Sequence, residues 1–238
     1  LKIKHKYGVF EIGMSKSVEI NELSKLIQPN IAIITNVGEA HLENFKNLKG
    51  IAKAKGEIIN NIREDGTIIL NRDDKYFKYL EKKAKSKNIN IVTFGMKKKS
   101  DVFLIKIIKT KKNKILKIKI QNQILYIEVA SINIYNILSS LAVFKILNFD
   151  LNKLTKFFKN QEPSDGRGKI HNIKRYGKNF KLIDESYNAN PLSVKNAINN
   201  FTSIKKQKFK KYLLLGDMLE LGKKSEFFHK NLSKVINN

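Results

Sequence analysis

A lysine on the apolar side of a predicted helix is the first residue whose type and position could support chemistry. Residues 40–62, AHLENFKNLKGIAKAKGEIINNI, repeat apolar residues at three- and four-residue steps, the pattern of a helix with one buried face. Lys55 falls on that face, whereas Lys53 projects from roughly the opposite side. Because burial disfavours the charged form of lysine, Lys55 is a candidate for an amine of lowered pKa. A lysine that extends its ammonium past the apolar edge into solvent is the alternative.

Two further polar residues lie near the ends of the predicted strands that precede Lys55. Glu11 lies near the end of the apolar run YGVFEIG, and His41 closes the segment TNVGEAH, which begins within the run IAIITNV. Ligands of open α/β folds gather at the carboxyl ends of parallel strands, where a carboxylate can bind magnesium. A solvent-facing glutamate and a structural histidine are the plainer interpretations of each residue alone.

Alternating strand and helix patterns predict an α/β protein with a mostly parallel sheet. From residue 101 to residue 129 the pattern changes to strict alternation, which predicts an antiparallel appendage with a turn near residues 111–113. The predicted strands of the parallel part are residues 7–13, 31–37, 67–71 and 91–95, and the predicted helices are residues 18–27, 40–62, 74–85 and 133–147.

The segment NQEPSDGRGK, residues 160–169, concentrates turn-forming residues and is predicted to link two domains, residues 1–162 and 163–238. In the second domain the predicted elements are strands at FKLIDESY and KYLLLGDM, a helix from Pro191 and a helix from about Ser225. Two strands are too little sheet to bury a core of their own, so we expect this α/β domain to be incomplete.

The composition narrows the class of protein. The chain has 238 residues and no cysteine, and it has no apolar run long enough to cross a bilayer and no secretory signal, so we expect a cytoplasmic protein. The formal charge of +26 raises the alternative of a lysine-rich nucleic-acid-binding protein. That alternative is disfavoured, because lysine accompanies isoleucine and asparagine throughout the chain, and only four arginines are available for base recognition: Arg63, Arg72, Arg167 and Arg175.

A phosphate-binding loop is missing from the sequence. GVFEIGMSKS has two glycines at the required spacing, but Met14 and Ser15 separate the second glycine from Lys16. The glycines also fall within a predicted strand rather than in a loop before a helix.

Four motifs together resemble the Mur ligase family: TNVGEAHLENF, AKAKGEI, DESYNANPLS and LGDMLELG. The combination of the last two is typical of the branch that adds D-alanyl-D-alanine, and the resemblance covers nearly the whole chain. It implies a central ATPase domain followed by a partial Rossmann-like C-terminal domain. Since the family's N-terminal domain, its phosphate loop and its last C-terminal strands have no counterpart here, we expect a fragment of such a ligase.

The resemblance also implies roles for individual residues. Lys55 matches a family lysine that is carbamylated by carbon dioxide and that, with the residues matching Glu11 and His41, positions a magnesium ion. Arg167, in DGRG, matches an arginine that reaches the ATP phosphates when the domains close. The remaining matches are Asn136 for adenine contact, Asp184 for the ribose, and Tyr187, Asn188 and Asn190 on the substrate side. The pattern around Asn136 departs from the family, and no role is assigned to Asp217 or Glu220.

The implied activity is ATP-dependent amide ligation in peptidoglycan precursor synthesis, with ATP and Mg²⁺ as cofactors. UDP-N-acetylmuramoyl-tripeptide would be activated as an acyl phosphate, and the amine of D-alanyl-D-alanine would displace phosphate. We expect the fragment to be inactive alone and the full-length enzyme to be a monomer. A sister Mur ligase or a folylpolyglutamate synthase-like ligase is the alternative within this class.

Overall fold

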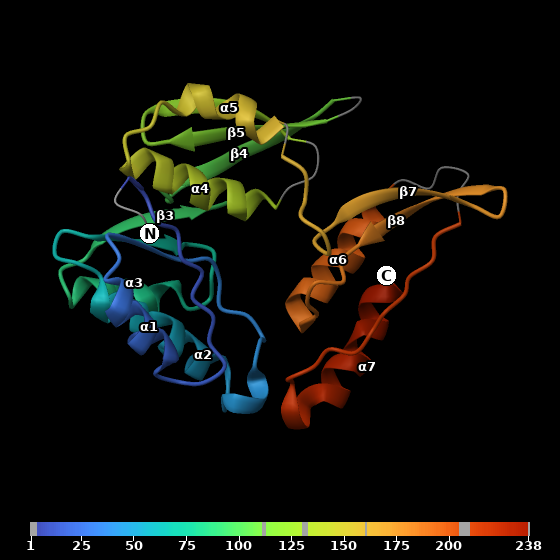
Figure 1. Cartoon of the computed structure of the whole chain (residues 1–238), viewed down its shortest axis with the longest axis horizontal. Coiled ribbons are helices and arrows are strands. Elements are labelled where there is room, and N and C mark those ends of the chain that lie inside the picture. Colours follow the sequence, from blue (N-terminus) through green and yellow to red (C-terminus); the bar gives the residue numbers. More distant parts are fainter. Residues whose placement is uncertain (1–3, 111–112, 130–132, 160, 205–209, 238) are drawn as a thin grey trace.

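The computed structural model describes residues 4–110, 113–129, 133–159, 161–204 and 210–237. Its larger sheet has six strands in the order β1-β2-β3-β4-β5-β6 (Figure 1). Pairs from β1 to β4 are parallel, and β4-β5 and β5-β6 are antiparallel, as predicted. The strands are β1 (Ile31–Ile34), β2 (Thr67–Asn71), β3 (Asn90–Gly95), β4 (Val102–Lys109), β5 (Lys114–Ile120) and β6 (Gln123–Val129).

Helices cover both faces of this sheet, because the side chains of its strands alternate between two apolar clusters. In β2, Ile69 belongs to the apolar cluster that includes residues of the helices Ile134–Ile146 and Leu151–Lys159. Ile68 and Leu70 belong to the cluster on the opposite face of the sheet. The helices of this part are α1 (Glu19–Ile27), α2 (Leu48–Lys55), α3 (Phe77–Lys85), α4 (Ile134–Ile146) and α5 (Leu151–Lys159). No helix among the described residues has the length and apolar character needed to span a membrane.

Residues 161–204 and 210–237 form a smaller unit. A hairpin of β7 (Lys169–Arg175) and β8 (Lys178–Asp184) is followed by α6 (Pro191–Ser203) and, after an extended segment, α7 (Ser225–Ile236). Helix α6 begins as the sequence predicts: the Asn190 side chain accepts from the Ser193 amide, and Pro191 is the first helical residue. We call the described residues between 4 and 159 the sheet unit and those between 161 and 237 the hairpin unit. The predicted domain boundary at residue 162 stays a prediction.

Two predicted strands are wrong. Residues 7–13 and 211–218 are extended without ladder pairing, and Val9 and Leu214 are 98% and 91% exposed. A strand needs a hydrogen-bonded neighbour as well as an apolar run, and among the described residues neither segment has one. The second strand of the small unit is instead β7, which pairs with β8.

The predicted helix over residues 40–62 is shorter than expected. Helix α2 begins at Leu48 because the Asn47 side chain accepts from the Gly50 amide and caps it. It ends at Lys55 and continues as a 3-10 segment, Gly56–Asn61. Lys55 therefore occupies the last α-helical position, near the sheet edge where β1 ends.

Candidate functional site

The Lys55 side chain is half-buried and points back toward the loop after β1, whereas Lys53 is exposed. Its Nζ donates to the backbone oxygen of Asn36 at 2.9 Å. Burial lowers the pKa of the Lys55 ammonium below its usual range, and the nearby Asp74 carboxylate partly opposes that shift. Lys55 thus has the environment that the sequence predicted, with an amine more easily deprotonated than a surface lysine.

Asp74 organises the same region from the loop after β2. Its carboxylate accepts from the Val37 amide and the Tyr76 amide, both at 2.7 Å. One carboxylate therefore joins the loop after β1 to the segment that leads into α3, and it is the acidic group facing Lys55. Sequence reasoning missed this residue, although an acidic pair directly after a buried strand, NRDD, is a signal that could have found it.

His41 lies at the end of the loop after β1 and contacts the hairpin unit. Its Nδ1 is 2.5 Å from Oε2 of Glu220, and the ring is partly exposed. The buried Nδ1 has no aligned hydrogen-bond partner, so His41 and Glu220 are in close contact without an in-line hydrogen bond. The predicted metal ligand is thus close to a carboxylate that sequence reasoning left without a role.

The three predicted magnesium ligands fit the ion unequally. Lys55 has a suitable environment, and a carbamate there would add two oxygen ligands. His41 has its Nδ1 in contact with Glu220, which leaves Nε2 as the ring nitrogen for a metal. Glu11 is exposed in the extended segment before α1. No three His, Asp or Glu side chains in the described ranges gather into a set that could hold a metal.

A second group of predicted residues converges at the base of the β7-β8 hairpin. The Arg167 guanidinium lies over the Tyr187 ring, 4.0 Å from its centroid. Asp184 accepts from the amides of Gly166 and Ser186, and its hydrogen bonds with Ser186 are the main reason that the pKa of its carboxyl is lowered. The turn is tight, since a side chain on Gly166 would meet the Tyr187 backbone nitrogen at 2.7 Å. Arg167, Asp184 and Tyr187 are therefore brought together.

Three other predicted residues occupy different positions. Asn136 is exposed in the first turn of α4, and Asn188 is exposed in the loop before α6. The side-chain oxygen of Asn190 is engaged as the helix cap, bonded to the Ser193 amide at 2.9 Å. Contacts of these residues with a nucleotide or substrate stay predictions.

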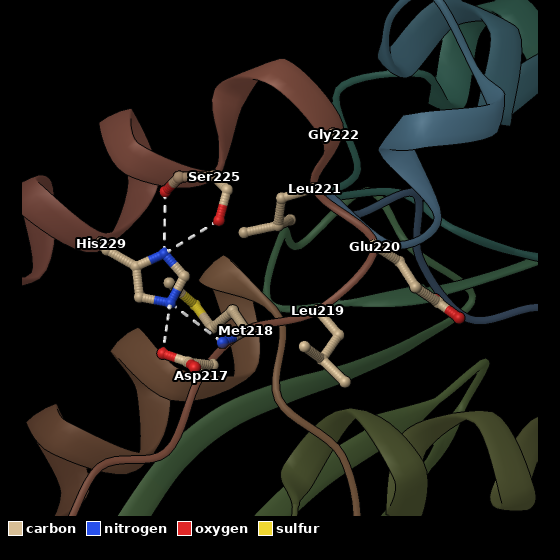
Figure 2. Close-up of a pocket in the computed structure, with 8 residues that line it drawn as sticks. All are labelled: Asp217, Met218, Leu219, Glu220, Leu221, Gly222, Ser225 and His229. Carbon is tan, nitrogen blue, oxygen red and sulfur yellow. Dashed lines mark hydrogen bonds and ion pairs between the residues drawn. The ribbon is translucent and has the colours of Figure 1, made fainter.

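The loop with the sequence DMLELG, residues 217–222, lines an open hollow of about 320 Å³ with Ser225 and His229 (Figure 2). The Met218 amide donates to Nε2 of His229 at 3.0 Å, while Nδ1 of that ring lies 2.8 Å from the Ser225 carbonyl oxygen. Since Nε2 accepts, Nδ1 carries the proton and donates. His229 therefore ties the loop to the first turn of α7.

One apolar cluster joins this loop to the sheet unit. Met218 and Leu221 are buried with Leu42 and Phe45, and Leu192 of α6 approaches the position that a side chain on Gly38 would take. The Glu43 amide also donates to the Glu220 carbonyl oxygen at 3.0 Å. In Figure 1 the segment after β1 and the segment before α7 meet at the lower edge of the molecule. All four motifs singled out in the sequence contribute residues to this cluster, which we call the shared cluster.

Comparison with known proteins agrees with the resemblance found in the sequence motifs. The family model for the Mur ligase middle domain matches residues 1–144. A UDP-N-acetylmuramoyl-tripeptide--D-alanyl-D-alanine ligase from Buchnera aphidicola subsp. Baizongia pistaciae is 31% identical over 241 residues, which cover 100% of this chain and 51% of the relative. The chain thus spans about half the length of the curated relatives that it matches.

Solved structures agree with the sequence matches. A crystal structure of MurF from Acinetobacter baumannii superposes with a TM-score of 0.87 at 28% identity, covering 99% of this chain and 50% of that one. The MurF ligase from Thermotoga maritima, solved in complex with ADP, gives a TM-score of 0.79 at 25% identity over 94% of this chain and 50% of that one. The fold class and the family predicted from the motifs are confirmed: this chain belongs to the Mur ligase family.

Proposed function

We propose that the protein containing this chain is an ATP-dependent ligase that joins D-alanyl-D-alanine to UDP-N-acetylmuramoyl-tripeptide in peptidoglycan precursor synthesis. The observation that carries the proposal is the environment of Lys55 in a member of the Mur ligase family: a half-buried amine of lowered pKa beside the loop after β1. The relatives matched along the whole chain have the name of this ligase, which favours it over a sister ligase or a folylpolyglutamate synthase.

The proposed metal site consists of Glu11, His41 and Lys55 as its carbamate. An uncharged amine is the nucleophile toward carbon dioxide, and the partial burial of Lys55 raises the fraction of that form. The Asn36 carbonyl holds the nitrogen at the sheet edge. Magnesium, when bound, would neutralise charge on the phosphoryl group being transferred.

The proposed nucleotide contacts come from both units. Asn136 would contact adenine, Asp184 the ribose, and Arg167 the phosphates. Arg167 stacks on Tyr187 through the face of its guanidinium, and the N–H groups in the plane of that group would donate to a phosphate as the units close on the nucleotide. Tyr187, Asn188 and Asn190 would face the substrates from the hairpin unit.

In the proposed reaction the tripeptide carboxylate attacks the γ-phosphate of ATP, forming an acyl phosphate and releasing ADP. The amine of D-alanyl-D-alanine then attacks the acyl carbon, loses a proton and expels phosphate. The protein contributes alignment of the reactants and stabilisation of negative charge. We further propose a cytoplasmic location and a monomeric full-length enzyme.

The test compares Lys55→Ala with Lys53→Ala, its neighbour on the exposed side of the same helix, in the full-length protein containing this chain. With ATP, Mg²⁺ and both substrates, we expect Lys55→Ala to reduce ligation by about 100-fold or more, as loss of a transition-state charge contact does, and Lys53→Ala to leave it near wild type. Short carboxylates should restore part of the lost rate. Equal activity of the two variants, or no ligation by the wild type, would contradict the proposal.

A further inference from the structure

The backbone conformation of both units positions the contact between His41 and Glu220. Both residues have left-handed backbone angles, with φ of 55° at His41 and 61° at Glu220. Residues other than glycine rarely adopt this conformation, and where they do the surrounding structure has to hold them there. The two side chains that meet therefore come from two such positions, one in each unit.

Several contacts hold the backbone around this pair. The Glu43 amide donates to the Glu220 carbonyl oxygen, two residues beyond His41. Gly222 has φ of 56°, and a side chain on it would meet Cα of Glu43 at 3.1 Å. On either side of Glu220, Met218 and Leu221 are buried in the shared cluster. Glu220 thus reaches His41 because the 217–222 loop is docked.

We propose that Glu220 is a positioning residue for His41, supplied by the hairpin unit when its 217–222 loop docks. Of the two neutral tautomers, a carboxylate this close to Nδ1 favours the one with the proton on Nδ1, because a carboxylate only accepts hydrogen bonds and repels a nitrogen lone pair. The lone pair is then on Nε2, where a ligand nitrogen needs it. This inference rests on the proposed role of His41 as a magnesium ligand.

The consequence is a dependence of the metal site on contact between the units. His41 belongs to the sheet unit, but the group that orders its ring belongs to the hairpin unit. When the loop separates, His41 loses its carboxylate partner and the preference for the Nδ1 proton with it. Docking of the hairpin unit then prepares the sheet unit for metal binding.

The direct test is nitrogen-15 NMR of histidine tautomers in the 238-residue chain at about pH 8, above the ordinary histidine pKa. Only four histidines need assignment: His5, His41, His171 and His229. We expect His41 to carry its proton on Nδ1 in the wild type and Glu220→Ala to shift the tautomer ratio toward Nε2 by about tenfold, the size of the effect of an adjacent charge at a partly exposed site. Gly222→Ala should shift it in the same direction by displacing the loop.

The matched control is Glu226→Ala, which removes an exposed carboxylate of the same unit that pairs with Lys230. It should leave the His41 tautomer unchanged. His229, with its proton on Nδ1, reports in every variant whether the loop and α7 are still folded. An unchanged His41 ratio in Glu220→Ala, or an equal shift in Glu226→Ala, would overturn the inference.

A second measurement connects the pair to magnesium. In the full-length protein, Glu220→Ala should raise the Mg²⁺ concentration for half-maximal ligation by about 10- to 100-fold, the range typical of partners that orient metal-bound histidines, with a smaller effect at saturating Mg²⁺. An unaltered Mg²⁺ requirement would contradict the positioning role even if the tautomer shifts. A wild-type protein that does not ligate would contradict the proposed function instead, and the NMR result would still decide whether Glu220 orders His41.

Discussion

The two units of the chain differ in how they obtain a core. The sheet unit buries β2 completely and builds apolar clusters on both faces of its sheet. In the part of the hairpin unit that the structure describes, the buried apolar side chains are Ile198, Met218, Leu221 and Leu232, and all four belong to the shared cluster with residues of the sheet unit. The first unit is stabilised by its own layers, whereas the second depends on a contact with the first.

This difference matters for function because the shared contact lies at the candidate site. The loop after β1 carries Asn36 and His41, and it is also the surface on which the hairpin unit rests. A unit with few buried contacts separates at low free-energy cost, which is the property of elements that open and close around ligands.

The largest expected effect is in the core of the sheet unit. Leu116 of β5 is fully buried, so Leu116→Ala should reduce the free energy of unfolding by about 2–5 kcal/mol, from lost apolar burial and the cavity left behind. Urea unfolding followed by circular dichroism measures it. The control Ile124→Ala, on the exposed side of β6, should cost about 0.5 kcal/mol. Similar losses for both variants would show that this sheet lacks the predicted core.

A smaller effect is expected where the units meet. Leu221→Asp places a charge in the shared cluster and should detach the hairpin unit. We expect amide exchange in α6 and α7 to rise by about 10- to 100-fold, which corresponds to about 1.4–2.7 kcal/mol. Exchange in β2 to β5 should stay at the wild-type rate.

Leu219→Asp is the matched control for this variant, because Leu219 is 74% exposed two residues away. It should leave both units protected. If Leu221→Asp increased exchange in the two units equally, the molecule would unfold as one cooperative body and the contrast between the units would be lost.

Helix α6 offers a change confined to the hairpin unit. Asn190→Ala removes the side-chain cap from the Ser193 amide and should cost about 1 kcal/mol, seen as faster exchange in the first turn of α6. Asn188→Ala, two residues earlier and exposed, should change stability by less than about 0.5 kcal/mol. If Asn190→Ala did not increase amide exchange in the first turn of α6, contacts with α7 rather than the cap would determine where this helix begins.

Local patterns predicted the elements whose causes are local. Helix α6 was predicted because Asn190 and Pro191 are a cap and a first-turn residue, and the antiparallel strands because residues 101–129 alternate. The difference in exposure between Lys53, which is exposed, and Lys55, which is half-buried, follows from helical spacing. These features need no knowledge of what lies on the other side of the element.

The features that the sequence did not predict depend on partners far away in the chain. Residues 7–13 and 211–218 have strand composition, but a strand forms only where another strand pairs with it, and the sequence of a segment does not contain its partner. The pair of His41 and Glu220 joins residues 179 positions apart by number, through a contact between two loops. Motif resemblance marked both loops without revealing that they touch.

The smallest expected effect concerns the pH dependence of stability at Lys55. Burial lowers the pKa of this lysine, so the unfolded chain binds more protons than the folded chain between the lowered pKa and the ordinary value of 10.5. Stability of the wild type should therefore rise with pH across that interval, and the cost of burying the ammonium is fully present below it. Lys55→Met removes this cost and should be as stable as the wild type, or more so, at neutral pH.

Unfolding free energies of wild type and Lys55→Met in buffers free of carbon dioxide would measure the difference, which should narrow as pH rises toward 10.5. Lys53→Met should track the wild type at every pH, because Lys53 is exposed. Adding bicarbonate and Mg²⁺ sharpens the test: a carbamate formed only in the folded state stabilises the wild type by mass action and cannot form in Lys55→Met. If the unfolding free energies of wild type and Lys55→Met changed with pH in parallel, Lys55 would be an ordinary solvated lysine. The sheet edge that contacts the hairpin unit would then have no amine of lowered pKa.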